Sequence, residues 1–306
     1  MVFSIPFFVG FSPYYLYLAT LVLVYIISVI GLNITLGYAG QITLGHAAFM
    51  GIGAYTVAIM TLRGWSFWLA FLLAGIISLV LGAIIGLPAI RVKDHYLAFV
   101  TLGFGSIIFL FMTNEEQLTG GFRGLYGIER PQLFSLGLSS DRAFYLFVAF
   151  VLILLTGTGL WILNSKWGRA FKAIRENEKR AEMVGVNLLA YKVAAFAIGS
   201  LYAGLSGGLL APLMRFIEPT SFPVTESFWL LIMLVVGGRG RFEGAIIGPL
   251  VVMVLPELLR GTEGLYFVLF SLISLIILIF WPTGLAGILE TLFEKIFNRE
   301  MPKLTK

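Results

Sequence analysis

Long apolar runs, separated by short polar segments, dominate the pattern along this chain. Runs of roughly 18 or more apolar residues are typical of helices that cross a bilayer. The candidate spans are residues 14–36, 43–62, 65–88, 97–113, 144–163, 190–212, 227–238, 244–259 and 264–281. The pattern therefore predicts an all-α polytopic membrane protein with about nine transmembrane or re-entrant helices, forming a single transmembrane domain over residues 1–306.

Two of these assignments are weak on length or polarity. Residues 227–238 supply only about 18 Å of helix, against a hydrocarbon core of roughly 30 Å. This segment is predicted either to be re-entrant or to be lengthened by Pro223-Val224-Thr225-Glu226. The turn at 37–42 carries no charge, and this is compatible with a position within the membrane instead of outside it.

Composition agrees with a membrane protein and excludes several other classes. The chain is 59% hydrophobic and 12% charged, with a mean hydropathy of +0.96, whereas soluble domains carry about 25% charge. Cysteine is absent, which excludes disulfides, thiolate metal sites and cysteine nucleophiles. The first apolar stretch lacks a basic region and a small-residue cleavage site, so we expect a retained helix and not a signal peptide.

The positions of the bases predict the orientation. Nine spans with an outside N-terminus place fifteen of the 21 bases, including every lysine, on the cytoplasmic side. The opposite side then holds Arg63, Arg123, Arg130, Arg142, Arg215 and Arg260. The positive-inside rule therefore favours an outside N-terminus and a cytoplasmic tail over about 283–306. Because topology accounts for the net charge of +5, nucleic acid is not expected as a partner.

A glycine-rich segment with polar side chains marks a candidate translocation core. Gly40, Gln41, Thr43, Gly45 and His46 lie in one stretch near the first two spans. Polar groups at membrane depth are costly unless they face protein or a water-filled path. A lone histidine there is more often a packing residue than a proton carrier.

Glu257, which follows Pro256, is also assigned to this candidate core. It is the only acid inside a predicted span, and intramembrane acids are often functional. Its place near the outer end of the span allows it to snorkel or to pair with Arg260.

The densest charge lies in a predicted cytoplasmic loop over about 164–189. A helix from Arg169 to Val184 would place small apolar residues on one face and bases on the other; the apolar positions are Ala170, Ala173, Ile174, Ala181 and Val184. Gly185 is predicted as the left-handed stop and Asn187 as the cap of the next helix, which re-enters the membrane at Leu188. From physics alone, this helix either rests on anionic headgroups or inserts into a groove of a cytoplasmic partner.

Other features bear on packing and exclude enzymatic sites. Small-xxx-small pairs, expected at close helix contacts, occur at Gly82/Gly86, Gly199/Ala203, Gly204/Gly208 and Gly244/Gly248. The chain has no phosphate-binding loop, no His-Glu-x-x-His and no Gly-x-Ser-x-Gly motif, so neither ATP hydrolysis nor another enzymatic activity is expected of it. A channel or a secondary transporter would need a polar constriction or a coupling-ion site, and neither is visible.

Several linked blocks resemble the permease subunits of high-affinity branched-chain amino-acid ABC importers, and the LivM type of subunit in particular. The resemblance covers about residues 15–285 and includes Asn33 to Tyr55, Tyr96 to Leu102, Thr119-Gly120-Gly121 with Gly127-Ile128, Gly168 to Val186, Gly237-Gly238-Arg239-Gly240 and Leu255-Pro256-Glu257-Leu258. The segments Arg239 to Glu243 and Phe122 to Tyr126 depart from the usual form of the family.

The resemblance implies a membrane-embedded half of an ATP-driven pore that imports leucine, isoleucine or valine. It implies a paralogous permease subunit, two cytoplasmic ATP-binding subunits that carry the ATP and Mg²⁺, and an external solute-binding protein. It also favours docking by the 164–189 loop, through Arg169, Ala173, Ile174, Arg175, Glu178, Ala181, Glu182 and Gly185. Within the class, import of urea or short amides is the alternative.

Overall fold

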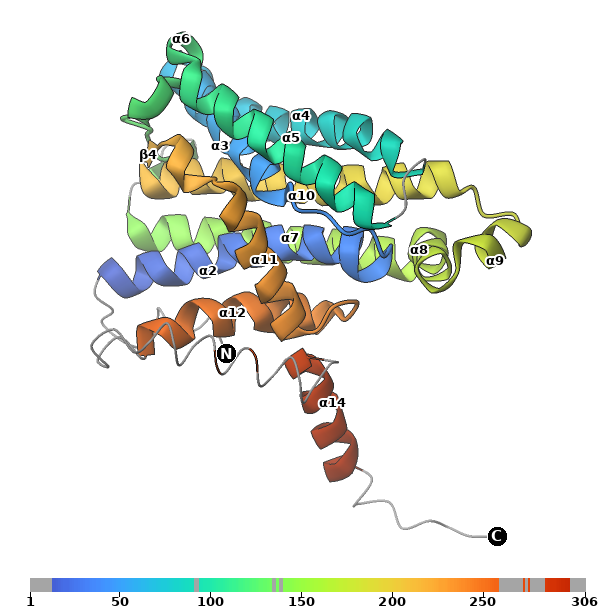
Figure 1. The fold of residues 1–306 in the computed structure, drawn as a ribbon. Helices are drawn as coiled ribbons and strands as arrows, with labels where there is room; N and C mark the ends of the chain where they lie inside the picture. The colour runs from blue at the N-terminus through green and yellow to red at the C-terminus, as the bar shows by residue number, and fades with distance from the viewer. Residues whose placement is uncertain are drawn as a thin grey trace, which may run out of the picture.

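The computed structural model describes residues 13–90, 94–133, 136–137, 140–258, 272, 275 and 284–297. Within these residues the protein is a bundle of helices (Figure 1). The longer helices are α2 (Pro13–Leu32), α3 (His46–Leu62), α4 (Phe67–Gly86), α5 (Asp94–Asn114), α7 (Asp141–Asn164), α8 (Lys166–Glu176), α10 (Leu188–Met214), α11 (Val224–Gly237), α12 (Phe242–Leu258) and α14 (Gly284–Phe297).

Short elements connect these helices. They are the π-helix η1 (Asn33–Tyr38), the 3₁₀ turns η2 (Leu87–Ile90), η3 (Gly121–Arg123) and η4 (Pro219–Ser221), and the helices α6 (Glu116–Thr119) and α9 (Glu178–Met183). Strand β1 (Leu125–Tyr126) pairs antiparallel with β4 (Phe216–Ile217), and β2 (Gln132–Leu133) pairs with β3 (Leu136–Gly137). In Figure 1, α8 and α9 lie at one end of the bundle and α6 and β4 at the other; we call these the α8 end and the α6 end.

The structure confirms a polytopic helical membrane fold but not the count of nine spans. Among the described residues, six helical segments are long and apolar enough to cross a membrane: Pro13–Tyr38, Phe67–Gly86, Tyr96–Asn114, Asp141–Asn164, Leu188–Met214 and Pro219–Gly237. The predicted span 264–281 lies outside the described residues, apart from two isolated positions.

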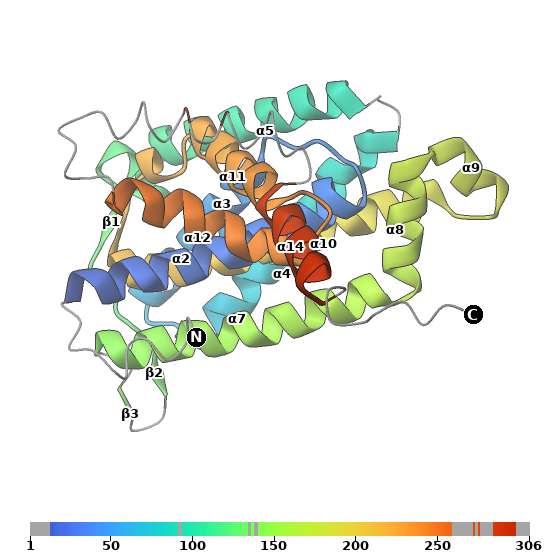
Figure 2. The ribbon, with the colours of Figure 1, turned by 90° about the horizontal axis from the view of Figure 1, so that it is seen from below.

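The predicted span 43–62 is wrong in its first residues. α3 begins only at His46, and its 17 residues make about 25 Å of helix, less than a membrane core. The preceding loop, 39–45, runs back from the α8 end, so that α3 starts inside the bundle (Figures 1 and 2). This second span is therefore part helix and part irregular chain, which membrane proteins tolerate only where the backbone is buried in protein.

The weak segment 227–238 is longer than its hydropathy indicated. α11 begins at Val224, directly after Pro223, so the helix takes in three of the four residues whose addition was predicted. This start brings Glu226 into the helix, where its carboxylate accepts a hydrogen bond of 2.6 Å from the Tyr25 hydroxyl. The prediction that Glu257 is the only acid within a span is therefore wrong, since Glu226 lies in the membrane-length segment Pro219–Gly237.

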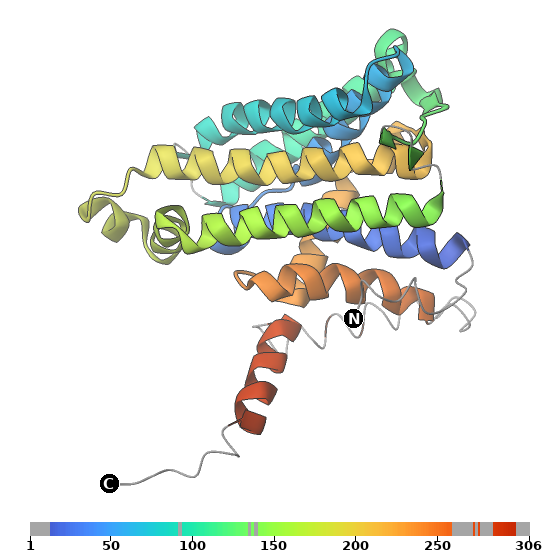
Figure 3. The same ribbon diagram turned by 180° about the vertical axis from the view of Figure 1, so that it is seen from behind.

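α10 is the central helix of the bundle, and most of its residues are buried. Figure 3 shows it running between α4 and α7. Close contact depends on small residues. A Cβ atom at Gly53 of α3 would overlap with the Gly204 carbonyl of α10, and one at Gly207 would overlap with the Met50 carbonyl of α3. Helices that meet backbone to backbone gain dispersion contacts that a bilayer cannot supply.

The predicted small-xxx-small pairs also lie at helix contacts. Gly82 and Gly86 of α4 face Ser200 and Phe196 of α10, and Gly199 of α10 faces Thr35. Gly244 and Gly248 of α12 pack against the end of α11. The prediction that these pairs lie at close helix contacts is therefore confirmed.

Candidate functional site

The predicted coupling helix is two helices and not one. α8 ends at Glu176, and Asn177 adopts an extended conformation (φ −164°, ψ 109°). The Asn177 side chain then accepts a hydrogen bond of 3.0 Å from the Arg180 amide and so caps α9. The helix predicted from Arg169 to Val184 is wrong at this point, because an asparagine can satisfy a free helix N-terminus and thereby breaks the continuous turn.

The end of this segment follows the prediction. Gly185 has φ +85° and terminates α9. The Asn187 side chain accepts a hydrogen bond from the Ala190 amide at the start of α10. α10 begins at Leu188 as expected.

The inner face of α8 and α9 packs on the protein's own core. Ala170, Phe171, Ile174 and Ala181 are buried, and the Phe171 ring lies 6.3 Å from that of Tyr191 in α10. Phe171 was not among the predicted apolar positions. Of the predicted coupling residues, Ile174 and Ala181 are buried, Ala173 and Glu178 are half-buried, and Arg169, Arg175, Glu182 and Gly185 are exposed.

An ion pair between a buried lysine and a partly exposed glutamate holds α9 to α10. The Lys192 ammonium, 5% exposed, lies 2.5 Å from the Glu178 carboxylate. The sequence analysis counted Lys192 only as a base that sets topology. Its position four residues into α10, facing an acid on a preceding helix, could have suggested this pair.

The apolar outer tip of the segment has no cover from the described residues. Met183 is 84% exposed and Val184 is 78% exposed, at the turn between α9 and α10. The prediction that Val184 belongs to the inner face is wrong, because the break at Asn177 rotates α9 relative to α8. A well-anchored segment thus presents two apolar side chains away from the bundle.

The polar segment before α3 is buried in the bundle. Gln41, Thr43 and His46 are each at most 3% exposed. The His46 Nε2 lies 2.9 Å from the Ser28 carbonyl oxygen, which agrees with a packing histidine. The Thr43 hydroxyl accepts the Gly45 amide at 3.3 Å.

Two hydroxyls that the sequence analysis did not assign complete this site. The Thr101 hydroxyl of α5 accepts the Leu44 amide at 2.9 Å, and the Ser227 hydroxyl of α11 accepts the Ala47 amide at 3.0 Å. The Ala47 N–H at the start of α3 and the Leu44 N–H just before it are thus satisfied by side chains from separate helices. A sequence pattern shows no sign of this because the partners are 57 and 180 residues away.

Gln41 is the exception in this segment. Its side-chain oxygen and nitrogen are both buried, and neither has a hydrogen-bond partner among the described residues. Leaving a buried amide unpaired costs about 1–3 kcal/mol. Such a group therefore points to a water molecule or a ligand.

Glu257 does not join the other predicted core residues. Its carboxylate accepts a hydrogen bond of 2.8 Å from the Tyr14 hydroxyl, where the C-terminal end of α12 meets the start of α2. The suggested partner Arg260 lies outside the described residues. Glu257 is thus placed at the opposite end of α12 from the glycine-rich turn that follows α11.

That turn, residues 238–241 between α11 and α12, meets η1 and α8 at the α8 end. The Arg175 guanidinium of α8 donates a hydrogen bond to the Gly37 carbonyl. The Asn33 side chain accepts from the Gly240 amide and donates to the Arg241 carbonyl, both at 2.8 Å. The 37–42 turn therefore packs against α8, and the structure joins Gly40 of the predicted core to Arg175 of the predicted coupling segment.

A cavity lies at each end of the bundle. One, of about 780 Å³, lies beside the junction just described and is lined by both charged and apolar groups, among them Tyr38, Lys172, Arg241, Ile247 and Glu290.

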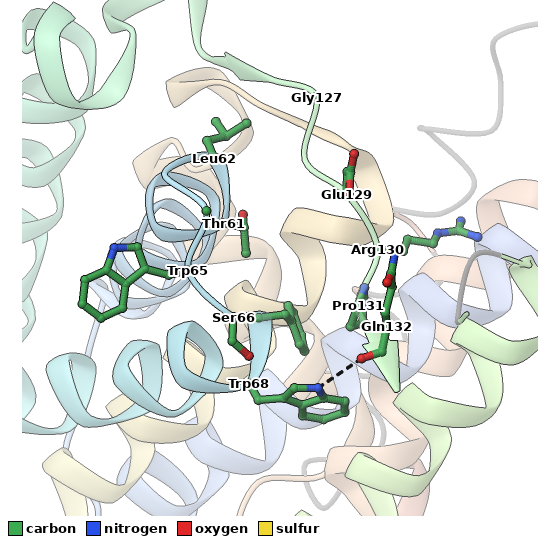
Figure 4. Close-up of a pocket in the computed structure, with 12 residues that line it drawn as sticks. Thr61, Leu62, Trp65, Ser66, Trp68, Gly127, Glu129, Arg130, Pro131 and Gln132 are labelled. Carbon is green, nitrogen blue, oxygen red and sulfur yellow. Dashed lines mark hydrogen bonds between the residues drawn. The ribbon is translucent and has the colours of Figure 1, made fainter. Parts of the chain in front are cut away.

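The other cavity, of about 540 Å³, lies between the α3–α4 turn and residues 127–132 (Figure 4). The Trp68 indole donates to the Gln132 carbonyl at 3.3 Å across it. Arg130 holds this loop to α7 through an ion pair of 2.7 Å with Asp141.

No group of three or more metal-binding side chains occurs in the described part of the chain. The candidate site is therefore described by the hydrogen bonds that link its segments and by its buried polar residues.

Comparison with known proteins gives one consistent result. The family described as branched-chain amino acid transport system, permease component, matches residues 14–282. The high-affinity branched-chain amino acid transport system permease protein LivM of Salmonella typhimurium is 33% identical over 294 residues, covering 88% of this chain and 69% of the relative.

More distant relatives include both types of permease. The probable LivM of Methanocaldococcus jannaschii is 29% identical, covering 71% of this chain and 67% of that protein. The LivH permease of Salmonella typhimurium is 28% identical, covering 86% and 91% respectively. No solved structure matches the chain. The chain is a multi-pass inner-membrane protein, and it belongs to the family of branched-chain amino acid transport permeases.

Proposed function

We propose that this chain is one of two permease subunits of an ATP-driven importer that moves leucine, isoleucine and valine from an external solute-binding protein into the cytoplasm. The cargo is supported by the names of the relatives, both LivM and LivH. Their occurrence as two types of permease supports a paralogous partner. ATP and Mg²⁺ would bind two separate cytoplasmic subunits, because this chain has no phosphate-binding loop.

The observation that carries the proposal is the exposed tip of the α8–α9 segment. Met183 and Val184 lie open at the end of a segment whose inner face is anchored by Phe171, Ile174 and the Lys192–Glu178 pair. Rigid anchoring with an exposed apolar end suits a helix that inserts into a partner's groove. An autonomous channel or secondary transporter has no need of such a surface.

Uptake of radiolabelled leucine at low micromolar concentration tests the cargo in cells that lack only this chain. We expect uptake to fall and to return with the restored gene, with valine competing and urea not competing. Intact leucine uptake, after other leucine importers are removed, would instead favour urea or a short amide.

Substitution of Gly185 tests the docking surface. No heavy atom lies within 4 Å of a Cβ placed at Gly185, so Gly185→Arg adds bulk without a steric clash, but any side chain there also strains the backbone at φ +85°. We expect Gly185→Arg to abolish uptake while membrane insertion stays normal. Gly185→Ala introduces the strain of a side chain at φ +85° without the bulk of arginine, so it should lower uptake less than Gly185→Arg does. Normal leucine uptake by the Gly185→Arg variant would contradict the docking proposal.

A further inference from the structure

Arg175 lies in a slot formed by glycines. Its guanidinium donates to the Gly37 carbonyl at the end of η1. A Cβ atom at Gly40 would lie 3.3–3.4 Å from the Arg175 Cα, Cβ and Cγ atoms. A Cβ atom at Gly240 would overlap with the Arg175 Nη1. Two glycines from separate connections, Gly40 and Gly240, thus leave room for one side chain of α8, and Gly37 supplies its acceptor carbonyl.

The two connections are tied to each other. Asn33 of η1 holds the Gly240 amide and the Arg241 carbonyl through its two side-chain polar atoms. A Cβ atom at Gly37 would overlap with that Asn33 oxygen. Since both ends of the Asn33 amide are used, η1 and the α11–α12 turn form one hydrogen-bonded unit, into which Arg175 inserts.

This unit connects to the polar core on one side and to α14 on the other. η1 leads directly into the 39–45 loop, which carries Gln41 and Thr43 and ends at α3. Arg241 forms an ion pair with Glu290 of α14. The cavity of about 780 Å³ borders the unit at Gly240 and Arg241, which leaves space for the unit to shift.

π-helical turns such as η1 are rare and frequently occur at functional sites. Here the wide turn brings the Gly37 carbonyl to Arg175 and, with Gly40 at φ +75°, sends the chain back into the bundle. A displacement of α8 therefore has a direct covalent and hydrogen-bonded route to the start of α3.

We propose that Arg175 is a transmission residue: it passes movement of α8 to η1 and the α11–α12 turn, and it does not serve to bind the ATP-binding subunits. This inference rests on the proposed function. It separates two groups within the predicted coupling segment. An outer tip at Met183 and Val184 meets the partner, and Arg175, although exposed, acts through its guanidinium on the chain's own core.

The test uses the full complex, purified through a tag on this chain and reconstituted in liposomes. Arg175→Ala should retain the ATP-binding subunits and their ATP hydrolysis, while leucine transport falls by about tenfold, within the range found for residues in coupling networks. Arg175→Lys keeps the charge but not the planar fork and should give an intermediate loss. Lys166→Ala, an exposed base on the same helix, is the control and should transport normally.

A second variant reaches the same contact from the opposite side. Gly240→Ala would displace the Arg175 guanidinium without changing α8, and it should reproduce the separation of ATP hydrolysis from transport. Gly64→Ala is the matched control, because Gly64 also has a left-handed φ of +82° but has no heavy atom within 4 Å of an added Cβ.

The inference is overturned if Arg175→Ala transports normally, or if it loses the ATP-binding subunits, which would make Arg175 a docking residue. Failure of the wild-type complex to move leucine would count against the proposed cargo instead.

A readout independent of cargo uses the absence of cysteine in this chain. A single Ile42→Cys in the 39–45 loop should change its maleimide labelling rate when ATP and vanadate are added. Adding Arg175→Ala should remove this effect of ATP and vanadate on the labelling rate. If the effect persists in the double variant, the inference is also overturned.

Discussion

Gln41 shows how much of a single residue's role can be predicted from the sequence. Its polarity at membrane depth marked it as a candidate, and the structure leaves its amide buried and unpaired while Thr43 and His46 both have partners. An amide offers one donor group and one acceptor, which suits the ammonium and carboxylate of an amino acid equally well.

Gln41→Leu should therefore separate transport from stability. No hydrogen bond is lost in the described part of the protein, so thermal stability in detergent should be unchanged or higher. Leucine transport should fall if the amide meets cargo or the water that solvates it. Thr43→Val is the comparison, since it removes the bond to the Gly45 amide and should lower stability. Undiminished transport by Gln41→Leu would remove this residue from the pathway.

At the scale of elements, the crossing of α3 and α10 depends on backbone contact. Gly53→Ala would place a Cβ against the Gly204 carbonyl, and a backbone atom cannot rotate away. We expect a loss of about 1–3 kcal/mol, as for other overpacked sites, seen as a lower melting temperature in detergent.

Gly157→Ala in α7 is the control for the α3–α10 contact. No heavy atom lies within 4 Å of a Cβ at Gly157, so the better helix propensity of alanine should leave stability equal or slightly higher. Equal melting temperatures for the two variants would contradict the close crossing.

The α8–α9 segment shows where the periodicity of apolar residues is insufficient to predict the helices. The spacing of apolar residues predicted one helix from Arg169 to Val184, and the positions Ala170, Ile174 and Ala181 are indeed buried. It did not predict the break at Asn177, because capping is a local hydrogen bond and not a hydrophobic pattern. Gly185 and Asn187 were predicted correctly since their roles depend on local backbone geometry alone.

For the whole molecule, the orientation follows from charge and remains a prediction that labelling can check. The absence of cysteine allows single-cysteine variants without background. Lys166→Cys, at an exposed position at the start of α8, should react with an impermeant maleimide only in inverted vesicles. Trp65→Cys, in the exposed α3–α4 turn, should react only in intact cells or right-side-out vesicles. Labelling of both from the same side would contradict the assigned topology.

The sequence by itself determined the class of fold, the family and the approximate places of the helices. These depend on properties summed over many residues, namely hydropathy, the distribution of bases and the order of several motifs. It also marked Gly40 and Arg175 separately, as parts of a core and of a coupling segment.

Only the tertiary structure decided that these two residues are neighbours, that α3 starts inside the bundle and that Thr101, Ser227 and Asn33 complete the site. The physical reason is the same in each case. Buried polar groups in a membrane protein must find partners wherever the packed helices bring them, and those partners are 57 to 208 residues away along the chain. Hydropathy and periodicity describe neighbours along one helix, whereas these contacts depend on how separate helices pack together.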